Sequence, residues 1–133
     1  TLAQIDEKLH ALARELDVSL ECFQSNHEGA LIDKLHQNID SVQGALINPA
    51  GLTQYGVALH DAIKAMPFPV IEVHLSNIAA REPWRAHSII SPAVKGTVQG
   101  LGWRSYTAAL RVLAELAAEL AAESRSTPKE TPS

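Results

Sequence analysis

The sequence is poor in cysteine and aromatic residues, has no long apolar run and carries no excess of positive charge. It contains one cysteine, Cys22, so an internal disulfide is impossible, and a zinc site built from cysteines is not expected. The net charge of −4 at pH 7 argues against electrostatic binding of nucleic acid or of an anionic membrane. No run of 18 apolar residues is present, and no basic segment followed by an apolar stretch opens the chain. These absences predict a reduced, soluble, cytoplasmic domain.

The composition is that of a globular protein. Hydrophobic residues make up 46% of the chain and charged residues 20%, while aromatic residues make up only 5%, so the core must be mainly aliphatic. A length of 133 residues fits one domain. We expect a single α/β domain over residues 1–123, followed by a disordered polar tail over residues 124–133 that is rich in Ser, Thr, Pro, Lys and Glu.

Two hydrophobic periodicities alternate along the chain. Apolar spacing of three and four residues predicts helices over 2–16, 28–37, 51–66 and 103–123, with a short helix or turn over 81–88. Period-two alternation and short apolar runs predict strands over 18–23, 44–47, 70–75 and 93–98. Ser25 or Asn26 is a candidate N-cap for the second helix, and Gly100 and Gly102 indicate a tight turn.

Strands that alternate with helices predict a parallel sheet covered by helices on both faces. The chain begins on a helix, however, whereas a doubly wound sheet places its first strand at the centre. Without that strand, two rows of buried backbone groups would lack partners, at about 1–3 kcal/mol for each unmade bond. We therefore expect that an N-terminal strand is missing from these residues, or that a rearranged assembly covers the gap.

Polar residues cluster at the carboxyl ends of the predicted strands, where parallel sheets bind ligands. On the strand over 70–75, Glu72 and His74 are two positions apart and face the same side, as does Ser76 if the strand runs that far. A carboxylate beside an imidazole fixes its tautomer and raises its basicity, so His74 is a candidate proton donor. The alternative is a half-buried histidine that is satisfied by its neighbour, because Glu-x-His is a weak pattern.

Several other polar residues have both a functional and a structural interpretation. Arg81 and Arg85 are four apart and point the same way on a helical turn, which suits a carboxylate or several hydroxyls, or else marks a solvated pair. Asn48 can turn its amide toward a ligand or simply form an Asn-Pro turn. Asp61 is by default a surface or interface carboxylate.

A metal or phosphate site has little support in the pattern. His60, Asp61, Glu72 and His74 contain the residue types of a two-histidine, one-carboxylate site, but the chain has no His-x-x-x-His pair. The glycines over 100–102 lack the third glycine or lysine of a phosphate-binding loop, so close packing is their simpler role.

Many stretches match one protein family in order and spacing, from the first helix to the last. They are residues 24–29, 31–33, 47–48, 57–59, 61–62, 71–77, 80–85, 87–88, 91–92, 100–102, 106 and 109–110. In these stretches the chain resembles type II 3-dehydroquinate dehydratase. The resemblance implies a flavodoxin-like doubly wound fold, no cofactor or metal, and a homo-oligomer in which trimers assemble into a dodecamer.

The resemblance also implies a reaction, the anti elimination of water from 3-dehydroquinate to give 3-dehydroshikimate. In the family, a lid tyrosine removes the proton at C2, an enolate forms, and a histidine protonates the departing C1 hydroxyl. Carried over to this chain, His74 is that general acid and Glu72 its orienting partner. Asn48 binds the C1 hydroxyl and holds a water near the enolate.

The remaining roles follow in the same way. The backbone at Leu75 and Ser76, with the Ser76 hydroxyl, would hold the substrate carboxylate. Arg85 would contact ring hydroxyls, Arg81 would help to hold the lid, and Asp61 would reach into the site of a neighbouring subunit. The same elimination serves both shikimate biosynthesis and quinate catabolism.

The chain departs from the family pattern in four places. The family's first strand and the lid with its tyrosine have no counterpart in these 133 residues. Where the family has Thr-His-Thr-Ser, this chain has Thr-Gln-Tyr-Gly, so a substrate-contacting histidine becomes Gln54, followed by Tyr55. His60 and Ala79 replace an arginine and a histidine. The alternatives are therefore a non-catalytic or specificity-altered relative that keeps the oligomer, or an unrelated flavodoxin-like binding module.

Overall fold

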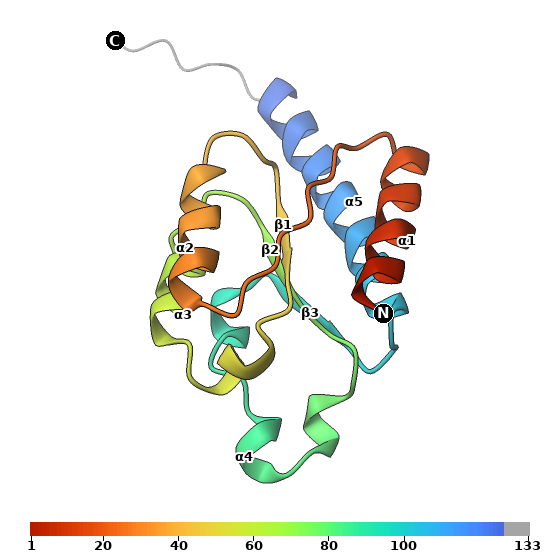
Figure 1. Ribbon diagram of the computed structural model, residues 1–133. Helices are drawn as coiled ribbons and strands as arrows, with labels where there is room; N and C mark the ends of the chain where they lie inside the picture. The colour runs from red at the N-terminus through yellow and green to blue at the C-terminus, as the bar shows by residue number, and fades with distance from the viewer. Residues whose placement is uncertain (127–133) are drawn as a thin grey trace, which may run out of the picture.

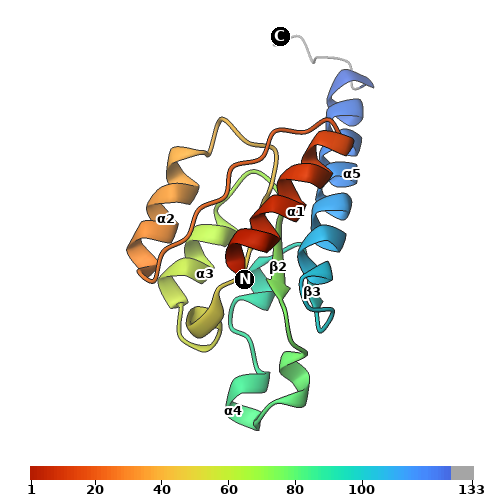
Figure 2. The same cartoon turned by 45° about the vertical axis from the view of Figure 1, so that its right-hand side comes forward.

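A parallel three-stranded sheet forms the centre of the molecule (Figure 1). The structure, a computed structural model, describes residues 1–126. The strands lie in the order β1 (Ala45–Ile47), β2 (Val70–His74) and β3 (Gly96–Gln99). Helices α1 (Leu2–Glu15) and α5 (Arg104–Ser126) cover one face, and α2 (Glu28–Gln37) and α3 (Val57–Lys64) cover the other (Figures 1 and 2). The predicted α/β arrangement with helices on both faces is confirmed.

The central strand β2 is buried along its whole length, which explains its β-branched, apolar sequence. Alternate side chains leave its two faces: Ile71 and Val73 pack against α5, whereas Val70 packs with α3. Glu72 therefore lies on the α3 face, in register with Ile47 of β1 on one side and Thr97 of β3 on the other. The sheet thus carries a carboxylate inside its core.

Aliphatic residues fill the space between the layers, as the low aromatic content predicts. The α1–α5 side is built on a cluster that includes Leu9, Leu12 and Leu110. The α2–α3 side is built on Leu59, Ile63, Phe68, Val70 and Ile90. Burial of side chains of this size contributes about 1.5–3 kcal/mol each.

The predicted strand over residues 18–23 is wrong. The segment is extended but belongs to no strand, and it crosses from α1 to α2 as a loop (Figure 1). The alternation of its side chains corresponds to a difference in burial, because Leu20 packs against the α1–α5 cluster, while Val18 and Phe23 remain exposed. A strand also needs a backbone partner, and no strand of the described chain pairs with this segment.

Other boundaries differ by a few residues. The helix predicted over 51–66 is split at Gly56 into a 3-10 helix, η1 (Ala50–Gln54), and α3. The strand predicted over 93–98 starts later, because residues 91–93 form the 3-10 helix η3 (Ser91–Ala93). The predicted caps of α2 are wrong: its N-cap is His27, whose amide donates to the Ser25 hydroxyl.

The turn and the last helix agree with the sequence pattern. Gly100 and Gly102 both have positive φ angles, of 84° and 60°, which favour glycine. Helix α5 runs to Ser126, three residues into the predicted tail, and residues 127–133 lie outside the described residues. Within residues 1–126, no helix combines the length and apolarity needed to span a membrane.

Candidate active site

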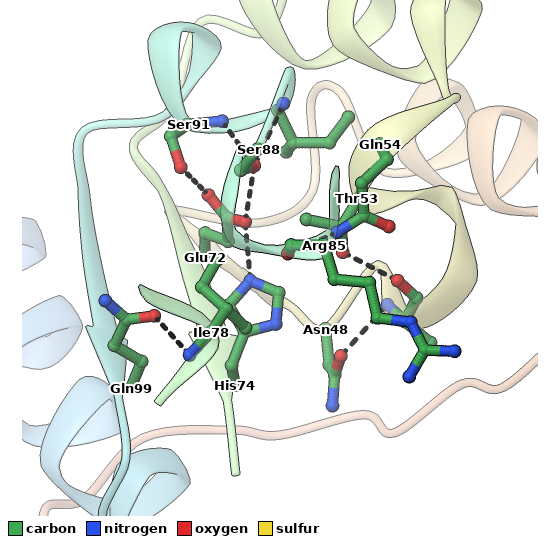
Figure 3. Close-up of polar contacts among 12 residues, drawn as sticks. Asn48, Thr53, Gln54, Glu72, His74, Ile78, Arg85, Ser88, Ser91 and Gln99 are labelled. Carbon is green, nitrogen blue, oxygen red and sulfur yellow. Dashed lines mark hydrogen bonds and ion pairs between the residues drawn. The ribbon is translucent and has the colours of Figure 1, made fainter. Parts of the chain in front are cut away.

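Glu72 and His74 meet at the carboxyl end of β2 (Figure 3). Glu72 has no exposed surface and His74 is 6% exposed. The Nε2 atom of His74 lies 2.6 Å from Oε2 of Glu72. The period-two spacing thus places both side chains on one face of the strand, as the sequence predicts. Since β2 ends at His74, Ser76 lies beyond the strand.

Two serines complete the surroundings of the Glu72 carboxylate. The hydroxyl of Ser88 donates to Oε2 of Glu72 at 2.9 Å, and that of Ser91 donates to Oε1 at 2.6 Å. These serines are 16 and 19 residues from Glu72, so no local spacing in the sequence connects them with it. The only local feature that groups the two serines is their spacing of three residues at a turn beside the sheet.

The hydrogen bonds determine the charge of Glu72. Burial acts to raise its pKa, but the hydrogen bonds from His74, Ser91 and Ser88 and the attraction to His74 outweigh it. The pKa of Glu72 therefore lies below its ordinary value, and the side chain is a carboxylate at neutral pH. An ionised carboxylate against an imidazole is an arrangement suited to proton transfer.

Asn48 follows β1 and is held at both ends of its amide. Its Oδ1 accepts from the amide of Ala50 at 3.0 Å, and its Nδ2 donates to the hydroxyl of Tyr106 at 3.0 Å. The turn needs Ala50 at a positive φ of 49°. Asn48 thus forms a turn, as its structural interpretation predicts, and its contact with Tyr106 also brings β1 and the start of α5 together.

Gln54 connects η1 to the short helix α4 (Pro83–Ala86). Its Nε2 donates to the backbone carbonyl of Arg85 at 2.9 Å. The carbonyl of Thr53 accepts from the amide of Ile89 at 2.9 Å, which joins η1 to the segment that follows α4. Tyr55, by contrast, is 70% exposed.

The two arginines do not share a helical turn, so that prediction is wrong. Arg81 ends the 3-10 helix η2 (Ile78–Ala80) in an extended conformation, and Pro83 starts α4 separately. Arg81 donates to the Ser76 hydroxyl. Arg85 instead stacks over Trp84, with its guanidinium carbon 4.4 Å from the ring centroid, beside Glu82 at 3.8 Å.

The chain after β2 is anchored by its backbone. The carbonyl of Leu75 accepts from the amide of Gly102 at 2.9 Å, and the amide of Gly100 donates to the carbonyl of His74. The glycine turn after β3 therefore holds the residue that follows His74. Leu75 itself is 41% exposed, so this end of the strand is open to the surface.

Asp61 lies apart from Glu72 and His74. Asp61 is exposed on α3, where its carboxylate lies 3.0 Å from Nδ1 of its neighbour His60. Glu28, the first residue of α2, accepts a hydrogen bond from the amide of Leu59 in the first turn of α3 at 3.2 Å. Across residues 1–126, no three histidine, cysteine or acidic side chains are grouped as a metal site requires, and His60 and Asp61 do not join Glu72 and His74 in one.

Comparison with known proteins identifies clear relatives. The profile of the family described as Dehydroquinase class II matches residues 1–114. The chain is 50% identical over 118 residues to the 3-dehydroquinate dehydratase of Desulforudis audaxviator, covering 89% of this chain and 79% of that protein. It is 48% identical over 114 residues to the enzyme of the same name from Gloeobacter violaceus, covering 86% and 71%.

Similar solved structures come from the same family. A type II dehydroquinase from Propionibacterium acnes superposes with a TM-score of 0.83 at 40% identity, covering 86% of this chain and 85% of that one. A 3-dehydroquinate dehydratase-like protein from Bifidobacterium longum superposes with a TM-score of 0.72 at 29% identity, covering 86% and 87%. The three-stranded sheet and its helices therefore match type II dehydroquinase structures.

Proposed function

The chain belongs to the class II dehydroquinase family, and from this premise we propose that it acts as a type II 3-dehydroquinate dehydratase with His74 as its general acid. The observation that carries the residue assignment is the buried Glu72–His74 pair at the carboxyl end of the central strand. The product, 3-dehydroshikimate, belongs to the shikimate pathway.

The reaction is an elimination in which the substrate loses a proton and a hydroxyl group. A base removes the proton at C2, and the electron pair is held as an enolate on the neighbouring carbonyl. The C1–O bond then breaks as the hydroxyl takes a proton from His74 and leaves as water, while the double bond forms between C1 and C2. A general acid of this kind contributes about 10²–10⁴-fold to the rate.

Glu72 would orient and stabilise the protonated imidazole without touching the substrate. It has no exposed surface, and three side chains already donate to its carboxylate. Its Oε2 would fix the orientation of the ring through the contact with Nε2. In this arrangement His74 would contact the substrate, and Glu72 would act only through His74.

Asn48 would bind the C1 hydroxyl and hold a water near the enolate. Its amide is preset by Ala50 and Tyr106, so it loses little freedom when a ligand arrives. The backbone at Leu75 and Ser76, with the Ser76 hydroxyl, would hold the substrate carboxylate. The arginine that contacts this hydroxyl, Arg81, adds positive charge there.

Recognition of the ring hydroxyls would fall to Arg85 and Gln54. The Gln54 amide holds the backbone of Arg85, so the two act as one unit. Asp61 would act from a neighbouring subunit, which suits its exposed position on α3. We propose a trimer-based dodecamer as the assembly that brings it there.

The test is an assay for the conjugated enone of 3-dehydroshikimate, which absorbs in the ultraviolet. Full-length protein given 3-dehydroquinate is expected to form the enone, and His74→Ala is expected to lose at least about 10²-fold in kcat. The absence of turnover in folded, full-length protein would show a non-catalytic relative. A His74→Ala variant with full activity would remove the assignment of the acid.

A further inference from the structure

The two serines on the Glu72 carboxylate are not equivalent. The Oγ of Ser88 accepts from the amides of Ile90 and Ser91, each at 3.1 Å, and lies 2.9 Å from Oε2 of Glu72 (Figure 3). A serine hydroxyl has one proton and two lone pairs. Since two amides occupy the lone pairs, the proton of Ser88 can only be donated to Glu72.

The hydroxyl of Ser91 has no such restriction. It lies 2.6 Å from Oε1 of Glu72, and among the described contacts it accepts no hydrogen bond. If Glu72 took up a proton, Ser91 would be able to turn and accept it, whereas Ser88 would not. Ser88 is therefore a donor with a fixed direction, and Ser91 is a donor that can reverse.

We propose that Ser88 is a positioning residue, which keeps the Glu72 carboxylate an acceptor and thereby keeps the shared proton on Nε2 of His74. This inference rests on the proposed function of the same site. It assigns a catalytic purpose to the turn that follows α4, because the two amides of that turn orient the hydroxyl. The lowered pKa of Glu72 agrees with a carboxylate that is held in its charged form.

The consequence is a defined tautomer for the acid. With the proton on Nε2 directed at Glu72, the other ring nitrogen, Nδ1, is left to exchange a proton with a ligand. In Figure 3, this second nitrogen points away from Glu72. A proton displaced onto Glu72 would leave Nε2 as an acceptor and lower the charge that His74 can deliver.

His74 is the titratable partner of Glu72 within the described residues. Beside Glu72 in the sheet lie Ile47 and Thr97, and η3 contributes the neutral Ser91. The charged and titratable side chains of the elements packed on this face sit at exposed or partly exposed positions; they are Glu28, Asp33, Lys34 and His36 on α2, His60, Asp61 and Lys64 on α3, Glu82 and Arg85 at α4, and His87.

The first measurement needs no variant and no turnover. In full-length protein labelled with ¹⁵N-histidine, the ring nitrogens of His74, assigned by comparison with His74→Ala, are expected to show the proton on Nε2. A neutral ring with its single proton on Nδ1 overturns the proposal. If the protein shows the expected tautomer but does not dehydrate 3-dehydroquinate, the proposed function fails while the proton arrangement stands.

The second measurement is the dependence of kcat on pH in Ser88→Ala. Loss of the fixed donor raises the pKa of Glu72, so the acid limb of the profile is expected to move to higher pH. We also expect kcat to fall about tenfold at neutral pH with little change in KM, as for the loss of one hydrogen bond to a charged group. Ser88→Thr keeps the hydroxyl and is expected to restore the acid limb.

Ser105→Ala is the matched control. Ser105 is also buried, and its hydroxyl also accepts a hydrogen bond from a backbone amide, that of Leu101 at 3.1 Å, but among the described contacts it makes no hydrogen bond to a titratable group. It is expected to lower stability without moving the acid limb. An unmoved acid limb in folded Ser88→Ala, or an equal movement in Ser105→Ala, overturns the proposal. If Ser88→Ala does not fold, the tautomer of the unaltered protein decides.

Discussion

Replacing Glu72 with glutamine separates the charge of this residue from its shape. Glutamine has nearly the same size, so the buried space is filled as before. With its amide oxygen in the place of Oε2, it accepts from Ser88 and His74, and with its NH₂ group in the place of Oε1, it donates to Ser91, whose hydroxyl can reverse. All three hydrogen bonds remain, and only the negative charge is lost.

The size of the effect follows from that comparison. A hydrogen bond to a charged group is worth about 1.5–3 kcal/mol and a neutral one about 1 kcal/mol. The bond to His74 therefore weakens by about 0.5–2 kcal/mol when the imidazolium is present, which corresponds to roughly a 2- to 30-fold loss in kcat. KM is expected to stay nearly constant, because Glu72 has no exposed surface with which to touch the substrate.

The assay is the rate of enone formation at saturating 3-dehydroquinate, with His74→Ala measured beside it. The loss in Glu72→Gln is expected to be smaller than that in His74→Ala, since the acid itself remains. A loss as large as that of His74→Ala would mean that Glu72 takes part in proton transfer directly. A change confined to KM would mean that it contacts the substrate, and either result would refute this reasoning.

Four further results are expected. Because the pKa of Glu72 is lower in the folded than in the unfolded chain, Glu72 stabilises the fold at pH values above its unfolded pKa, and this stabilisation is lost as the pH falls through the folded pKa. The Tm of Glu72→Gln should therefore fall less steeply on acidification than that of the unaltered protein. Parallel curves of Tm against pH would contradict this. His74→Ala should remove the fall in kcat at high pH that arises when the general acid loses its proton. If that high-pH limb is retained, another residue is the acid. Asp61→Ala should weaken the trimer, measured by sedimentation, or raise KM, while leaving proton transfer intact; if both stay unchanged, the assignment to a neighbouring subunit is wrong. The double variant Gln54→His with Tyr55→Thr should lower KM for 3-dehydroquinate, and an unchanged KM would remove the idea that these positions alter recognition.

Much of the fold was predictable because it depends on local periodicity. Helix α2 has the predicted bounds, 28–37, and the period of two along β2 was enough to place Glu72 and His74 on one side. The alternation over 18–23 misled because it reports which side chains are buried, whereas a strand is defined by backbone partners.

The parts that could not be predicted depend on contacts between distant segments. The bonds from Ser88 and Ser91 to Glu72 join residues that only the folded turn after α4 brings together. The spacing of Arg81 and Arg85 suggested one helical turn, but Pro83 begins a new helix between them, because proline favours the first turn of a helix. Helical spacing is informative only when one helix contains both residues.

The segment between β2 and β3 projects from the body of the molecule as an arm carrying η2 and α4 (Figure 2). Both of its ends reach the candidate site, through the Ser76 hydroxyl at one end and the Ser88 hydroxyl at the other. A ligand that binds to the arm would therefore act on two segments at once, the one that follows His74 and the one whose Ser88 hydroxyl contacts Glu72. Protease cleavage within the arm, slowed by substrate or an inhibitor, would offer a direct gauge of occupancy that needs no turnover.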